Sequence, residues 1–178
     1  MISRRNLLIG GAALTTAFSL PIISVRSQSS HLSLWPASPP GGGGPSGSPD
    51  ITKRGAVTNI AVPGLEIFNP ERPNGSAVII AGGGGYKRIE EGKESYPAAR
   101  WLAKRGIFAF VLTYRLPIEG WAAGPLAPLQ DVQRALRLVR AIAAAWQIAP
   151  NNNRSLGHSP GGPSFGLSAP PPAFGSVE

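Results

Sequence analysis

Cysteine is absent from the 178 residues, and histidine occurs only at His31 and His158. The missing thiols exclude a disulfide framework, a thiolate metal site and a cysteine nucleophile. Two histidines are also too few for a multi-histidine metal centre. We therefore expect neither a metal nor another cofactor in this protein.

Charged residues are scarce, at 15% of the chain, and the formal net charge is +8. Arg4, Arg5 and Arg26 lie in an N-terminal segment without acidic residues, so the rest of the chain carries +5. The remaining cations are spread among Glu and Asp along the sequence, whereas nucleic-acid binding needs a clustered basic face. We expect no nucleic-acid partner.

Residues 1–27 have the pattern of an export signal. The stretch Ser3-Arg4-Arg5-Asn6-Leu7-Leu8 is a twin-arginine n-region, and residues 9–23 form an apolar segment without charge. Residues 25–27 offer small-residue spacing for cleavage. The alternative is an uncleaved membrane anchor. We expect the twin-arginine export machinery as a partner, a periplasmic or secreted location, and no stable membrane anchor.

Residues 28–54 are predicted to be a Gly/Pro-rich linker, because the run Pro39-Pro40-Gly41-Gly42-Gly43-Gly44-Pro45 does not favour helix or sheet. A flexible arm that lies over the domain fits this composition. The folded part is expected to span residues 55–178.

Apolar runs and helical periodicity alternate after residue 55. Two short β-type runs, 56–62 and 65–68, flank Pro63-Gly64 and predict an antiparallel pair. Continuous apolar runs predict strands buried on both faces, and stripes at helical spacing predict helices. The predicted strands cover 76–80 and 107–112, and the predicted helices cover 95–105 and about 128–146. This alternation predicts an α/β domain with a mostly parallel sheet flanked by helices.

Two glycine motifs fall where strands of the sheet are expected to end, although residues 151–156, before the second motif, contain only one large apolar residue. Residues 157–161 spell G-x-S-x-G, the nucleophile elbow, with Ser159 as the candidate nucleophile. Residues 82–85 are four glycines directly after the first buried strand, where backbone amides could reach an oxyanion without interference from side chains. Ligands of such sheets collect at the carboxyl ends of the strands. Chance occurrence in Gly/Ser/Pro-rich sequence and a plain tight turn remain the alternatives.

Four segments in order carry a resemblance to a known family: 78–86, 113–116, 128–135 and 157–159. Together they resemble the N-terminal half of a secreted α/β-hydrolase of the acetyl-esterase or acetylxylan-esterase type. The resemblance implies an α/β-hydrolase fold with Ser159 as nucleophile and with Gly83 and Gly84 as oxyanion-hole donors. It also implies that Tyr114, Arg115 and Asp131 are scaffold positions rather than catalytic residues.

The sequence departs from the family pattern at several places. Ala81 stands where a histidine often opens the glycine loop, and Pro160 has no N–H to serve as the second oxyanion donor. The triad acid and histidine follow the serine in this fold, but the sequence after Ser159 contains no His and only Glu178 as an acid. His158 is expected to pack beside the elbow. We therefore interpret the chain as a truncated copy with weak or no esterase activity.

The expected function is serine-type hydrolysis of carboxylic esters, with a small-molecule or carbohydrate ester as substrate and deacetylation as the favoured reaction. Two alternatives stay open from the sequence: an exported, non-catalytic binding protein that keeps the cleft, and an unstable fragment of a hydrolase. The acyl group, the alcohol part and the oligomeric state are not indicated by any motif.

Overall fold

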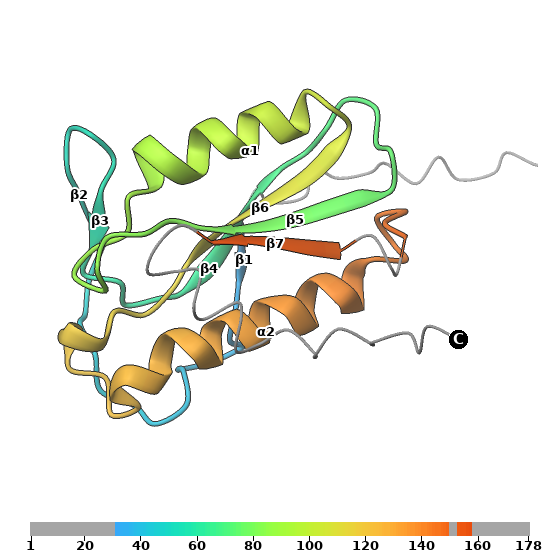
Figure 1. The fold of residues 1–178 in the computed structure, drawn as a ribbon. Helices are drawn as coiled ribbons and strands as arrows, with labels where there is room; N and C mark the ends of the chain where they lie inside the picture. Colours follow the sequence, from blue (N-terminus) through green and yellow to red (C-terminus); the bar gives the residue numbers. More distant parts are fainter. Residues whose placement is uncertain (1–30, 150–152, 158–178) are drawn as a thin grey trace, which may run out of the picture.

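A five-stranded sheet with one α-helix on each face forms the body of the protein, as the computed structural model shows (Figure 1). The structure describes residues 31–149 and 153–157. The strands are β1 (His31–Ser33), β2 (Asp50–Ile51), β3 (Val57–Thr58), β4 (Gly64–Phe68), β5 (Ser76–Ala81), β6 (Ile107–Thr113) and β7 (Asn153–Gly157). The helices are α1 (Tyr96–Ala103) and α2 (Ala127–Ile142), with a π-helical turn η1 (Glu91–Ser95) and 3-10 turns η2 (Pro117–Glu119) and η3 (Gly124–Leu126).

The strand order across the large sheet is β1-β4-β6-β5-β7. Strands β6, β5 and β7 are parallel, whereas β4 pairs antiparallel with both β6 and β1. Strands β2 and β3 form a separate antiparallel pair. The parallel part of the sheet therefore includes the strands that precede both glycine motifs.

Strands β5 and β6 are buried on both faces because helices cover both sides of the sheet. On the α1 side, Ile80, Ala109 and Val111 pack with Ala99 and Leu102 of the helix. The larger core lies on the α2 side. Its members from the sheet and α2 include Leu65, Ile67, Ile79, Phe108, Phe110, Leu112, Val132, Ala135 and Val139.

The predicted α/β class and the four elements that frame the site are confirmed. The strands predicted at 76–80 and 107–112 are β5 and β6, and the predicted helices are α1 and α2. Both helices are shorter than predicted. The N-terminal turn of the first one is π-helical, and the second ends at Ile142 rather than near Trp146.

The predicted antiparallel pair of residues 56–62 and 65–68 is wrong. Residues 57–58 form β3 and pair with β2, while β4 pairs with β6 and β1. Asn59 has a left-handed backbone, with φ of 56°, and Glu119 accepts hydrogen bonds from the amides of Asn59 and Ile60 at 2.6 and 3.1 Å. The chain turns away at this point, so the two runs do not form a hairpin.

Residues 31–54, which we predicted to be linker, pack against the domain. Strand β1 extends the sheet beside β4, and the glycine run lies against the loop around Trp121. A Cβ on Gly44 would come within 2.4 Å of the Trp121 ring, and the Gly44 amide donates to the Gly120 carbonyl at 3.1 Å. Glycine is needed here for close approach to the indole rather than for flexibility.

No helix within 31–149 or 153–157 combines the length and the apolar character that crossing a bilayer requires. The predicted export signal, residues 1–27, lies outside the described residues.

Candidate active site

The two strands that precede the glycine motifs are neighbours in the sheet. Strands β5 and β7 are parallel, and their register pairs Ile80 with Leu156 and Ala81 with Gly157. The carboxyl ends of both strands therefore lie at the same edge. Gly157 is the first residue of the predicted nucleophile elbow, and the residue after Ala81 is the first of the glycine loop, 82–85. Ser159, the predicted nucleophile, lies outside the described residues, as do His158 and Pro160.

The glycine loop has a backbone that only glycine tolerates at its centre. Gly84 has φ of +134°, and a Cβ built on it would lie 2.2 Å from the carbonyl oxygen of Arg88. Gly85 is also left-handed, with φ of +67°, but a Cβ there would meet nothing within 4 Å. The requirement for glycine is therefore steric at Gly84 and conformational at Gly85.

Hydrogen bonds to its carbonyls hold the glycine loop in place. The buried Tyr114 hydroxyl donates to the Gly82 carbonyl at 2.8 Å. The amide of Glu90 donates to Gly83 O at 2.9 Å, and that of Lys87 donates to Gly84 O at 3.2 Å. These three hydrogen bonds tie the carbonyls of the glycine loop to the surrounding protein.

Tyr114→Phe is expected to destabilise the protein by about 1–3 kcal/mol, because it leaves the Gly82 carbonyl without its hydroxyl donor. Tyr114 is 1% exposed, so water does not easily replace the lost donor. Urea unfolding followed by tryptophan fluorescence measures the change. A loss of less than about 0.5 kcal/mol would contradict the assigned role.

The amide of Gly83 donates to the Glu94 carboxylate, with 2.7 Å between N and Oε2. This amide, one of the two predicted oxyanion-hole donors, therefore faces a negatively charged oxygen supplied by the protein itself. One N–H makes one strong hydrogen bond, so an oxyanion could accept from Gly83 only after the carboxylate has moved away. Sequence reasoning missed Glu94, because nothing in the run Glu90-Glu91-Gly92-Lys93-Glu94 distinguishes it from its neighbours.

A buried carboxyl group lies behind the same loop. Glu91 is 3% exposed, and its Oε1 accepts from the Thr113 hydroxyl at 2.6 Å. The Tyr96 hydroxyl lies 3.1 Å from Glu91 Oε2 and 2.9 Å from Glu66 Oε2. One hydroxyl proton cannot serve two carboxylates, so a proton on one of the two carboxyls completes the arrangement. Burial raises the pKa of Glu91, with a smaller contribution from the nearby charge of Glu66, and makes Glu91 the better site for that proton.

The Glu91 carboxyl is expected to make the protein less stable as the pH rises above about 4.5, the ordinary value for glutamate. Its raised pKa means that the folded state holds a proton that the unfolded state releases, so the stabilisation is complete below that pH and is lost above it. Glu91→Gln keeps the size of the side chain but cannot titrate.

The measurement compares the free energy of unfolding of the protein and of Glu91→Gln across pH 4 to 8. We expect the difference between them to shift in favour of the glutamine variant as the pH rises. A difference that does not change with pH, or that changes in the opposite direction, would contradict a raised pKa. Glu71→Gln, at an exposed glutamate, is the control for titration outside the core.

Arg115 and Asp131 form a buried ion pair between the segment after β6 and the helix α2. Their side chains are 0% exposed and approach to 2.9 Å, and the Arg115 amide also donates to Asp131 at 2.9 Å. Trp35 Nε1 donates to the same carboxylate, and the Arg115 guanidinium lies 5.2 Å from the centre of the Trp121 ring. The carboxylate thus joins the segment that follows β6, the helix α2 and the N-terminal segment, which suits a scaffold position.

His31 lies on β1, far from the glycine loop. It is the one histidine within the described parts of the chain, and β4 and β6 separate its strand from β5. Neighbouring strands are about 4.8 Å apart, so roughly 14 Å separate β1 from β5. His31 is therefore too distant to act as a base for a nucleophile at the β5–β7 edge.

Comparison with known proteins gives matches to esterases. No family model matches the chain. An acetylxylan esterase of Xylanibacter ruminicola is 41% identical over 95 residues, which are 53% of this chain and 19% of that protein. Two solved structures have a TM-score of 0.50 and cover 60% of this chain. An acetyl ester-xyloside bifunctional hydrolase of Caldicellulosiruptor lactoaceticus is 38% identical, and a putative carboxylesterase of Lactobacillus plantarum is 32% identical.

These matches cover only part of each relative. The aligned region is about a fifth of the acetylxylan esterase, 38% of the Caldicellulosiruptor hydrolase and 42% of the Lactobacillus carboxylesterase. Within that region the sequence identity and the mixed, mostly parallel sheet between helices agree. The resemblance predicted from the motifs is therefore confirmed: the chain is similar, in sequence and in fold, to part of the α/β-hydrolase esterases of the acetyl-esterase and acetylxylan-esterase type.

Proposed function

We propose that this chain is part of a serine-type carboxylic ester hydrolase that removes acetyl groups from carbohydrate esters. The observation that carries the proposal is the register of β5 and β7, which puts Gly157 beside Ala81. Two residues span at most about 7 Å, so Ser159 has only a short reach from the end of β7. Ala81 and Gly157, the last residues of β5 and β7, therefore lie side by side, and our proposal is that the Ser159 hydroxyl meets the glycine-loop amides at this edge.

In the proposed reaction, the Ser159 oxygen attacks the acetyl carbonyl carbon and forms a tetrahedral intermediate. Its oxyanion accepts hydrogen bonds from the amides of Gly83 and Gly84, once the Glu94 carboxylate has left Gly83. Breaking the ester C–O bond releases the sugar hydroxyl and leaves acetyl-serine, which water hydrolyses to acetate. The serine proton passes to a water molecule during attack and from it to the leaving oxygen.

These 178 residues alone are expected to catalyse this reaction poorly. Within the described residues the one histidine, His31, lies on β1 and cannot reach this edge, and Pro160 cannot donate an N–H to the oxyanion. A missing general base costs about 10²–10⁴-fold in rate, and a missing oxyanion donor costs about 10²–10³-fold. Both steps of the reaction are then slow, but attack on an activated ester needs less help from a base than hydrolysis of acetyl-serine by water does, so we expect slow acylation and still slower deacylation.

The relatives support the substrate class. The names of the Xylanibacter and Caldicellulosiruptor proteins describe an acetylxylan esterase and an acetyl ester-xyloside hydrolase. Both names combine an acetyl ester with a xylose-based carbohydrate. We therefore propose an acetylated carbohydrate as the substrate, with acetate and a free sugar hydroxyl as products.

Acylation of Ser159 tests the function more sensitively than turnover does. We propose to incubate the full chain with 4-nitrophenyl acetate and to locate the acetyl group by mass spectrometry of peptides. The expected result is acetylation of Ser159 that is lost in Ser159→Ala and retained in the control Ser164→Ala. Acetyl groups only on lysines, to the same extent in all three proteins, would overturn the proposal.

Export also belongs to the proposed function. We propose that residues 1–27 direct the protein across the cytoplasmic membrane by the twin-arginine route, on the pattern around Arg4 and Arg5. Fractionation of bacterial cells that produce the full chain provides the test. Replacing both arginines by lysine should leave the protein in the cytoplasm, and unchanged export of that variant would contradict the proposal.

A further inference from the structure

A groove of about 440 Å³ lies beside the glycine loop, between the β2–β3 hairpin and the segment that leads into η1. It is lined by Thr52, Lys53, Arg54, Ala56, Arg88, Glu90 and Lys93. Four of these side chains are cationic and one is acidic. The four cations come from two segments more than thirty residues apart in the sequence, so folding creates a basic cluster that the linear sequence does not show.

The acid in this basic groove is already engaged. Glu90 Oε1 accepts from Arg88 Nε at 2.5 Å. The hydrogen bond from Arg88, together with the positive charges of Lys93 and Arg54, lowers the pKa of Glu90, so this carboxylate is ionised at neutral pH. Four positive charges against one negative charge leave the groove with a net +3.

Backbone hydrogen bonds fix the two walls of the basic groove to each other. Val57 and Ile89 exchange hydrogen bonds of 2.8 and 2.9 Å, and the Gly92 amide donates to Gly55 O at 2.9 Å. A Cβ on Gly92 would lie 2.3 Å from the carbonyl oxygen of Arg54, which shows how closely the walls approach. The two backbone segments that carry the cations are therefore held together by hydrogen bonds.

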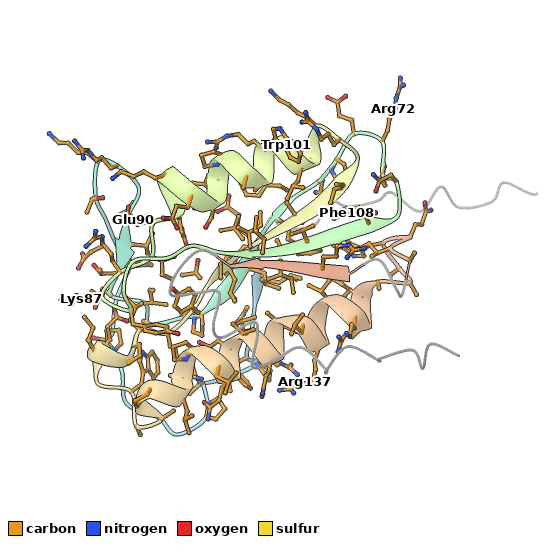
Figure 2. The ribbon with its side chains drawn as sticks, viewed as in Figure 1. Arg72, Lys87, Glu90, Trp101, Phe108 and Arg137 are labelled. Atoms are coloured by element: carbon orange, nitrogen blue, oxygen red, sulfur yellow. The ribbon has the colours of Figure 1, made fainter. Side chains whose placement is uncertain are left out.

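The segment from Arg88 to Glu90, which lines the basic groove, also contacts the glycine loop. Glu90, which lines the basic groove, donates its amide to Gly83 O, and the carbonyl of Arg88 lies against the Cα of Gly84. In Figure 2 the labelled Glu90 and Lys87 lie at the end of the molecule where β5 and β7 finish, and Arg72 lies at the opposite end. A ligand in the groove would therefore lie next to the proposed oxyanion donors.

We propose that the basic groove binds the carboxylate of an acidic sugar, such as a uronic acid, carried by the acetylated carbohydrate that the protein deacetylates. This inference rests on the proposed function and names the substrate class more closely. Arginine side chains bind carboxylates through paired N–H donors, and exposed lysines add positive potential around them. The shallow, open shape suits a sugar side group on an extended chain rather than an enclosed small molecule.

Binding of two matched oligosaccharides tests the proposal without depending on catalysis. The probes are unsubstituted xylotriose and xylotriose that carries one glucuronic acid, titrated calorimetrically into the full chain at low salt. We expect about tenfold tighter binding of the acidic probe, from two or three charge contacts of a few-fold each near the surface. The preference should largely disappear in 1 M NaCl, where charges are screened within about 3 Å.

Two double variants separate the groove from the total charge of the protein. Lys53→Gln/Lys93→Gln removes two cations from the groove, and Arg72→Gln/Lys104→Gln removes two from a depression at the other end of the sheet. The proposal predicts that the preference for the acidic probe falls below about threefold in the first variant only. Equal binding of both probes, no binding of either, or an equal loss in both variants would overturn it.

Inorganic phosphate and glucuronic acid as competitors identify the occupant. Displacement of the acidic probe by glucuronic acid at lower concentration than by phosphate supports a sugar carboxylate, and the reverse order overturns it in favour of a phosphate site. Failure of the proposed function would show instead as unacetylated Ser159, which this binding measurement does not involve. The two hypotheses can thus fail separately.

Discussion

Asp131→Ala is expected to destabilise the protein by about 3–5 kcal/mol, the largest loss of any single substitution considered, because it leaves the Arg115 charge buried and unpaired. Both side chains of the pair are 0% exposed. Arg115 has further acceptors in the Pro40 carbonyl and the Gln130 side chain, but these carry no negative charge. Trp35 would also lose its indole acceptor.

Urea unfolding followed by tryptophan fluorescence measures this loss, since Trp35 and Trp121 border the pair. Arg137→Ala, at an exposed arginine of the same helix (Figure 2), is expected to change the stability by less than about 0.5 kcal/mol. The double variant Arg115→Met/Asp131→Leu should recover part of the loss, because no charge is left buried without a partner. A cost of less than about 1 kcal/mol for Asp131→Ala would contradict the structural role of the pair.

Gly84→Ala is the second substitution with a large expected effect, and Gly85→Ala is its matched control. Both glycines have positive φ, so alanine costs about 1–2 kcal/mol of backbone strain at either position. Only at Gly84 would the added Cβ also collide with the Arg88 carbonyl, at 2.2 Å. The loop would have to shift by more than an ångström to remove that contact.

We therefore expect Gly84→Ala to destabilise the protein by at least about 1 kcal/mol more than Gly85→Ala does, because the clash with the backbone adds to the strain. Such a shift would also move the Gly83 and Gly84 amides, so acetylation of Ser159 by 4-nitrophenyl acetate should fall about 10²-fold, the value of one misplaced oxyanion donor. Gly85→Ala should retain most of the acetylation. Equal effects of the two variants on stability and on acetylation would show that the loop geometry around Gly84 is not the determinant.

The elements that frame the site could be predicted from the sequence because their signals are local. Strands β5 and β6 are continuous apolar runs, α2 has a clear apolar stripe, and the glycine loop follows β5 directly. Each signal depends on a single segment and on the two periodicities of the backbone.

Partners distant in the sequence could not be predicted in the same way. The pairing of β1 with β4 and of β4 with β6 depends on segments up to about fifty residues apart, and propensity carries no information about which runs meet. The contact of the glycine run with Trp121 has the same origin. From its composition we predicted a flexible linker there, but close packing of a backbone against an indole ring also requires glycine.

The chemistry of the site was predictable in part. The place of the glycine loop after β5 follows from the sequence, whereas the hydrogen bond from the Gly83 amide to the Glu94 carboxylate depends on the turn η1, which no local signal indicated. The basic groove likewise arises when the hairpin carrying Lys53 and Arg54 folds onto the segment of Arg88 and Lys93. Charges that are dispersed along the chain are brought together by these contacts.

A crystal structure of the full chain that includes Ser159 tests the central claim most directly, because that claim is a distance. In the tetrahedral intermediate the oxyanion lies about 2.7–3.1 Å from its amide donors and is two bonds away from Ser159 Oγ. Ser159 Oγ must therefore lie within about 5 Å of the Gly83 or Gly84 amide nitrogen. We predict a separation within about 5 Å, with the Glu94 carboxylate either away from the Gly83 amide or free to move away from it. Ser159 Oγ more than about 10 Å from both amides, or on the opposite face of the sheet, would contradict the account.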